Sequence, residues 1–120
     1  MGASKLSRFI VAAAERRSHG RRRGNLAAKL ALGTTAADCT IRDLSHGGAR
    51  IEAPSVGSLP DEVYLLILDD GIVVRARCAW ADLPWFGLKF LDAEAIEDCT
   101  RPQCEPLKRA WRDRTSQPLG

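Results

Sequence analysis

The 120-residue chain has few of the features that mark membrane proteins or exported proteins. Its longest apolar run near the N-terminus is the six residues 9–14, whereas a membrane-spanning helix needs about 20. That run is also shorter than the roughly 7–15 apolar residues of a secretory signal, and no convincing cleavage site follows it. We therefore expect a cytoplasmic protein that does not insert into a membrane.

Sequence motifs of catalysis are missing as well. The chain contains no GxSxG elbow, no Walker loop and no GxGxxG. Asp43, Ser45 and His46 are the residue types of a nucleophilic triad, but they lie within four positions of one another. Residues this close rarely place the base between nucleophile and carboxylate. We expect no enzyme and no catalytic residues.

Cysteine and histidine are scarce. The cysteines are Cys39, Cys78, Cys99 and Cys104, and the histidines are His19 and His46. Without an export signal, reduced thiols are expected. Cys99 and Cys104 have a spacing that a metal site could use, but no second Cys/His pair at ligand spacing exists, so we predict no metal site. Cys39 and Cys78 lie in strand-like runs and are expected to be small core residues.

The composition is that of one folded domain, and the charge is unevenly distributed. Hydrophobic residues make up 45% and charged residues 28% of the 13.1 kDa chain. The net charge of +3 hides seven basic and one acidic residue in 1–25, against 11 basic and 14 acidic residues in the remainder. A cationic leader on a slightly acidic body indicates an anionic partner.

Residues 1–25 are predicted to form a basic N-terminal helix followed by an arginine-rich segment. Apolar residues recur there at the spacing of one helix face, namely Leu6, Phe9, Ile10 and Ala13. Ser18-His19-Gly20 breaks this pattern. The helix either packs on its own domain or serves as a docking segment.

Residues 26–92 have the pattern of a β domain. The expected strands are Leu26–Leu32, Ala37–Leu44, Ala49–Ala53, Val63–Leu68, Ile72–Trp80 and Trp85–Leu91. Asp69-Asp70-Gly71 is a strong hairpin signal. Alternation puts Ile72, Val74, Ala76, Cys78 and Trp80 on one face of the fifth strand. Six short strands without intervening helices predict a mainly β protein, an antiparallel barrel or sandwich.

Residues 93–120 are expected to form a C-terminal helical segment and tail. Ala93–Cys99 is helix-like, and Leu107–Arg114 could form another short helix anchored by Trp111. The sequence thus predicts one or two short C-terminal helices.

Arginines are clustered at the end of the leader. Arg17 and Arg21 are four residues apart, and Arg16, Arg22 and Arg23 flank them. A guanidinium binds phosphate bidentately, stacks on a base and donates to the O6/N7 edge of guanine. The cluster therefore suits a nucleotide, although a solvated basic turn is the simpler alternative.

A second polar element, Asp43-Leu44-Ser45-His46-Gly47-Gly48, separates two predicted strands. The Asp43 carboxylate can accept from guanine N1–H and N2–H₂, and Ser45 adds a hydroxyl. Gly47 and Gly48 permit positive φ and a close backbone approach. An ordinary capped turn has the same composition.

Together the two elements resemble the PilZ domain family, the bacterial receptors for cyclic diguanylate. Residues 17–21 match RxxxR and residues 43–48 match (D/N)xSxxG, in the family's order. The resemblance covers roughly residues 15–92. It implies a six-stranded antiparallel β-barrel with a helix after the last strand, and a single domain of about residues 15–114.

The resemblance also implies the ligand and its contacts. Cyclic diguanylate would be the ligand, with no further cofactor. Its phosphates and guanine edges would be held by Arg17 and Arg21, and a guanine by Asp43, Ser45 and Gly48. Arg16 matches a position that influences whether one or two stacked ligand molecules bind. The chain departs from the family by continuing Arg22-Arg23, so either residue could share the ligand or replace Arg21.

As a member of that family, the protein would be a second-messenger effector. It would change conformation on ligand binding and signal to a protein partner through the N-terminal helix or the barrel surface. One alternative is a PilZ-like protein-interaction module without ligand. A less favoured one is a non-specific nucleic-acid-binding protein that uses the N-terminal arginines.

Overall fold

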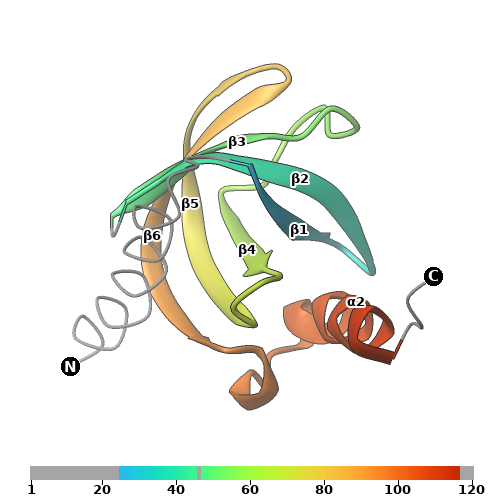
Figure 1. Cartoon of the computed structure of the whole chain (residues 1–120). Coiled ribbons are helices and arrows are strands. Elements are labelled where there is room, and N and C mark those ends of the chain that lie inside the picture. The colour runs from blue at the N-terminus through green and yellow to red at the C-terminus, as the bar shows by residue number, and fades with distance from the viewer. Residues whose placement is uncertain (1–24, 46, 117–120) are drawn as a thin grey trace.

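The computed structural model describes residues 25–45 and 47–116 (Figure 1). The expected N-terminal helix therefore lies outside the described residues. So do four predicted ligand-binding residues, Arg16, Arg17, Arg21 and Arg22.

Six antiparallel strands close into a barrel with the order β1-β2-β3-β6-β5-β4 (Figure 1). They are β1 (Leu26–Leu32), β2 (Thr35–Leu44), β3 (Gly48–Glu52), β4 (Glu62–Ile67), β5 (Ile72–Asp82) and β6 (Trp85–Ala95). Each predicted strand has its counterpart in the structure. The predicted mainly β class and six-stranded antiparallel barrel are confirmed.

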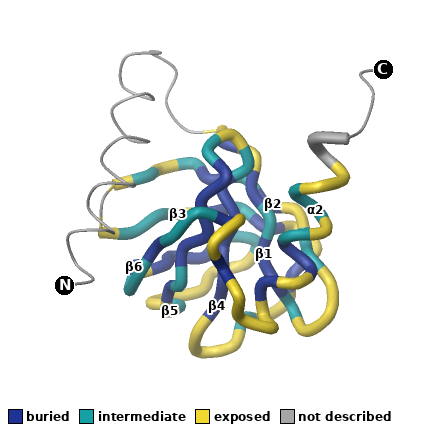
Figure 2. Tube along the Cα trace, turned by 90° about the horizontal axis from the view of Figure 1, so that it is seen from below, coloured by how far each residue is buried: buried dark blue, intermediate teal, exposed yellow. Residues whose placement is uncertain are grey.

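The barrel interior follows from the alternation of side chains along each strand. Phe86, Leu88 and Phe90 of β6 point into the main core, as their spacing predicts. Strand β4 is buried on both faces: Val63, Leu65 and Ile67 belong to this core, and the residues between them pack outside it. Figure 2 shows buried residues along the strands and exposed residues in the connecting turns. The continuous apolar run of β4 is thereby explained.

A second core lies outside the barrel, beneath the C-terminal helix α2 (Glu105–Ser116). Leu66 of β4 and Leu107 of α2 are both fully buried in it. Trp111 of α2 lies against Gly71 of the β4–β5 turn, where a Cβ atom would be 2.9 Å from the indole. Gly71 has a φ of 64°, as the hairpin signal predicts. Trp111 thus anchors α2, as expected.

The helix predicted over Ala93–Cys99 is wrong. Residues 93–95 extend β6, because they pair with residues 72–74 of β5. Two single 3₁₀ turns follow, η1 (Ile96–Asp98) and η2 (Pro102–Cys104). The described C-terminal segment therefore contains one α-helix. No helix within the described ranges is long and apolar enough to cross a membrane.

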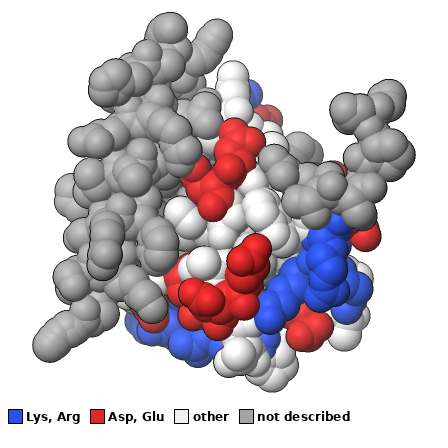
Figure 3. All heavy atoms as spheres, turned by 60° about the horizontal axis from the view of Figure 1, so that its bottom comes forward, with Lys and Arg blue, Asp and Glu red and all other residues white. Residues whose placement is uncertain are grey.

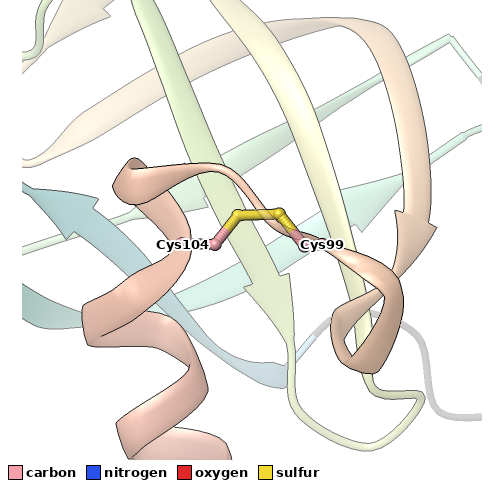
Figure 4. The surroundings of a disulfide bond; sticks show 2 residues. All are labelled: Cys99 and Cys104. Atoms are coloured by element: carbon pink, nitrogen blue, oxygen red, sulfur yellow. A yellow bond between two sulfur atoms is a disulfide. The ribbon is translucent and has the colours of Figure 1, made fainter.

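Cys99 and Cys104 form a disulfide across the η1–η2 connection (Figure 4). The expectation of reduced thiols is wrong for this pair. Both residues are fully buried in the second core beside Leu107. The disulfide holds the start of α2 close to the end of β6. The free thiol of Cys39 lies in the barrel core, and burial raises its pKa to about 12. Cys78 is half-buried at the edge of that core.

Trp80 lies on the opposite face of β5 from the one that simple alternation predicts. The register between β5 and β6 shifts between Cys78 and Trp80, which leaves Ala79 as an extra residue. A β-bulge of this kind turns the following side chains to the other face of the sheet. Trp80 is therefore 46% exposed, and Gly87 is its partner on β6.

Candidate functional site

The polar turn predicted from the sequence joins β2 to β3. The Ser45 N–H donates to the Gly48 carbonyl over 2.9 Å, and the Ser45 hydroxyl donates to the same oxygen over 3.3 Å. The Gly47 N–H donates to Ser45 Oγ over 3.4 Å. From β6, the Phe90 N–H donates to the Gly47 carbonyl over 2.9 Å. The turn is thus tied both to itself and to a neighbouring strand.

The close approach of β3 to β6 requires a glycine at position 48. A Cβ atom at this position would lie 2.4 Å from the Leu88 carbonyl oxygen of β6, which is too close for any side chain. At Gly47 a Cβ atom would meet no described atom within 4 Å. Of the two glycines, Gly48 is the one whose missing side chain the described structure explains.

A β-bulge in β2 brings Asp43 to the outer surface. The register with β3 shifts between Ile41 and Asp43, so Arg42 is an extra residue in β2. Ile41 is fully buried in the barrel, Arg42 is half-buried and Asp43 is exposed. Because of the bulge, Arg42 and Asp43 both make their contacts on the outer face.

On this face the Asp43 carboxylate is paired with Arg50 of β3. Arg50 Nε donates to Asp43 Oδ2 over 2.8 Å, and Arg50 Nη2 lies 2.7 Å from the same oxygen. No described residue donates to the second carboxylate oxygen, Oδ1. The pair is largely exposed, and an exposed ion pair contributes only about 0–1 kcal/mol. Breaking this ion pair so that Asp43 can bind a ligand therefore requires little free energy.

The guanidinium groups of two arginines lie over the indole ring of Trp85 in β6. The Arg50 guanidinium lies 4.6 Å from the centroid of the indole ring, and that of Arg42 lies 5.9 Å from it. Arg42 also pairs with Glu52 at 2.9 Å and donates to the side chain of Asn25. Asn25 directly precedes β1, so this network links the motif turn to the point where the leader joins the barrel.

A shallow hollow of about 250 Å³ lies at the turn. It is lined by Asp43, Leu44, Ser45, Gly48, Ala49 and Arg50. Binding sites for small molecules usually measure about 300–1,000 Å³. The hollow is thus smaller than a typical small-molecule site.

A larger hollow of about 530 Å³ lies elsewhere, between the β1–β2 hairpin and α2. None of the motif residues lines it. Its Lys29 is paired with Asp38, and its Arg109 donates to the Thr34 carbonyl over 3.1 Å. Its two basic side chains are thus already engaged, and we do not assign it to the ligand.

Among the predicted ligand-binding residues, the structure brings Asp43, Ser45, Gly47 and Gly48 together in one turn. The predicted arginines cannot be compared with it, because they lie outside the described residues. Sequence reasoning missed Arg50 and Trp85. The register of the β2–β3 hairpin pairs Arg50 with Asp43. Counting residues outward from the turn along both strands could therefore have identified Arg50. For Trp85 the sequence carried no comparable signal.

The described structure is a closed barrel with an exposed polar turn and a shallow hollow beside it. The model of the PilZ domain family matches residues 15–101, most of the chain, and the chain belongs to this family. PilZ domains are a family of cyclic diguanylate receptors and are in general not enzymes. The match includes both RxxxR and the turn at 43–48. A comparison with curated proteins found no match.

Proposed function

We propose that this protein binds cyclic diguanylate between the RxxxR segment and the turn at residues 43–48. The observation that carries the proposal is the placement of Asp43 and Ser45 beside one hollow on the outer face of a PilZ barrel. A carboxylate can accept from both guanine N1–H and N2–H₂, whereas the same edge of adenine offers no matching pair of donors. Asp43 would therefore select guanine.

The length of the leader is compatible with this site. Arg21 is four residues before Asn25, and an extended chain spans at most about 3.6 Å per residue, or roughly 14 Å. Arg17 has twice that reach. Asn25 itself is bonded to Arg42, the neighbour of Asp43. Both motif arginines are accordingly within reach of the hollow, where they would neutralise the ligand phosphates.

The proposed signalling step depends on the positive charge of the leader. Ligand phosphates would reduce the repulsion within the +6 leader and fix it against the barrel, which would change the surface offered to a protein partner. No further cofactor is required. We also propose the cytoplasmic location that was expected from the sequence. The Cys99–Cys104 disulfide is unusual for that compartment.

A PilZ scaffold that binds only proteins is the second candidate. The Arg50–Asp43 ion pair favours it, because the carboxylate already has a partner within the protein. Non-specific nucleic-acid binding has less support. Figure 3 shows separate acidic and basic patches on the described part of the face below the barrel, whereas the arginines on which this alternative depends lie outside the described residues.

Calorimetric titration with cyclic diguanylate tests the proposal through Asp43. The Asp43→Ala variant should bind roughly 10- to 100-fold more weakly, since it loses hydrogen bonds to a charged group. Asp38→Ala, which removes an exposed carboxylate from the same strand, should bind like the wild type. The cyclic diadenylate analogue should bind far more weakly. Equal binding of the two dinucleotides, or equal loss in both variants, would refute guanine recognition by Asp43.

A further inference from the structure

The hollow between the β1–β2 hairpin and α2 has no role in the proposed function. Its volume of about 530 Å³ lies within the range of about 300–1,000 Å³ that is usual for binding sites. Residues 34–36 of the hairpin and four residues of α2 are among those that line it, and we call it the helix hollow.

The helix hollow and the motif turn lie at opposite ends of β2. Thr35 lines the helix hollow, and Asp43 lines the hollow at the turn. Eight positions along the strand separate these residues, which corresponds to about 26 Å. In Figure 1 the β1–β2 turn lies beside α2, away from the other end of β2. A molecule bound in the helix hollow therefore leaves the motif turn accessible.

The floor of the helix hollow is apolar and contains two small side chains. Ala36 and Ala110 are half-buried, and Leu68 and the buried Pro106 line the same space. Ala36 and Leu68 also pack against the second core. An apolar side chain inserted into the hollow would therefore extend an existing core.

The rim carries two charges of opposite sign that no ion pair within the described residues neutralises. Arg109 donates to the Thr34 carbonyl over 3.1 Å, so its guanidinium has a hydrogen bond but no carboxylate partner there. Asp113 is exposed and lies one helical turn further along α2. The third charged side chain of the lining, Lys29, is already paired with Asp38.

The spacing of the two charges fits a second helix. Side chains four residues apart lie on one face of a helix, with about 5–6 Å between their Cβ atoms. A helix that carries a glutamate and a lysine at this spacing can pair the first with Arg109 and the second with Asp113. An apolar residue between them then faces the floor, which is the usual arrangement when an amphipathic helix binds in a groove.

We propose that the helix hollow is a docking site for an amphipathic helix of a protein partner. The helix inserts one apolar side chain onto the floor and pairs a glutamate and a lysine with Arg109 and Asp113. Because the site is about 26 Å from the motif turn along β2, the partner and a ligand at the turn bind at the same time. This inference goes beyond the proposed function and does not depend on it.

Nuclear magnetic resonance titration of the intact ¹⁵N-labelled chain with two synthetic peptides tests the proposal. Each peptide has about 15 residues, the length at which alanine-rich helices begin to form in water. Each carries one leucine between a glutamate and a lysine four positions apart, and the two differ in the order of the charges, which covers both helix directions. We expect one peptide to shift the amide signals of residues 32–36 and 106–113, with a dissociation constant between about 10 μM and 1 mM.

Two variants of the protein test the floor and the rim separately. Ala110→Leu fills the floor and Arg109→Glu reverses one rim charge, and each should weaken binding at least about 5-fold. A peptide with lysine in place of its glutamate should restore binding to Arg109→Glu but not to Ala110→Leu. Lys108→Glu is the matched control, because it makes the same kind of charge reversal on α2 outside the lining of the hollow, and it should bind like the wild type.

Several results would overturn the proposal. One is the absence of signal changes at the hollow with both peptides, and another is equal weakening by Arg109→Glu and Lys108→Glu, which would assign binding to the overall charge of α2. A wild-type dimer in sedimentation that Ala110→Leu dissociates would assign the hollow to a second copy of this chain. Signal changes at the hollow in Leu119→Ser without peptide would assign it to residues 117–120, which follow α2.

The proposed function is tested separately in the same variants. Ala110→Leu and Arg109→Glu should bind cyclic diguanylate like the wild type, so a failure of either proposal is distinguishable from a failure of the other. Melting curves establish that each variant is folded, and the charge-reversed peptide tests the rim even if Ala110→Leu does not fold.

Discussion

Gly48 and Gly47 occupy adjacent positions in the motif turn but meet different surroundings. At Gly48 any side chain would collide with the Leu88 carbonyl of β6, which is backbone and cannot rotate away. At Gly47 the space is open within the described residues. The two glycines of one motif therefore have separable roles.

This difference predicts the stability of two variants. Gly48→Ala should lower the free energy of unfolding by about 1–3 kcal/mol, the usual cost of overpacking, because β3 must move away from β6. Gly47→Ala should change it by less than about 0.5 kcal/mol. Urea unfolding followed by circular dichroism measures both. Similar values for the two variants would contradict the close approach at Gly48.

Individual residues of the site were only partly predictable from the sequence. The sequence placed Asp43, Ser45 and Gly48 at one turn because a turn motif is local in sequence, and their role in ligand binding stays a prediction. Arg50 and Trp85 were missed because their contacts depend on strand pairing. Trp80 was assigned to the wrong face, because a β-bulge interrupts alternation without leaving a signal in the residue pattern.

At the level of elements, hydrophobic alternation and turn residues located the strands well. The first strand was predicted with its observed bounds, Leu26–Leu32. The main failure was Ala93–Cys99, where residues 93–95 pair with the start of β5. Such pairing is set by the whole barrel and overrides the local helical preference of an Ala- and Glu-containing segment.

The connection between β6 and α2 depends on the Cys99–Cys104 disulfide. It closes a loop of about six residues, for which chain entropy predicts about 2 kcal/mol of stabilisation. Reduction should therefore lower the free energy of unfolding by about 2 kcal/mol, while the barrel strands remain folded. Urea unfolding with and without reductant provides the measurement.

The matched control is the double variant Cys99→Ser/Cys104→Ser. Its stability should already be lowered and should not respond to reductant, since Cys39 and Cys78 are free thiols. A reductant effect of the same size in this variant would show that the disulfide is not its cause.

The whole molecule combines a basic leader with a slightly acidic body. The small net charge of +3 conceals this division, and only the position of the charges indicates an anionic ligand. The family match joins the two parts, because residues 15–101 include the end of the leader and the entire barrel. In our proposal the described barrel supplies one side of the ligand site and the leader supplies the other.

The most direct test is a calorimetric titration of the intact chain with cyclic diguanylate, comparing Arg17→Ala and Arg21→Ala with Arg8→Ala. Each substitution removes one positive charge from the leader, but only the first two alter RxxxR. We predict wild-type binding at micromolar ligand, about 10- to 100-fold weaker binding for Arg17→Ala and Arg21→Ala, and unchanged binding for Arg8→Ala. Absence of wild-type binding, or equal losses in all three variants, would contradict a ligand clamped between the leader and the barrel turn.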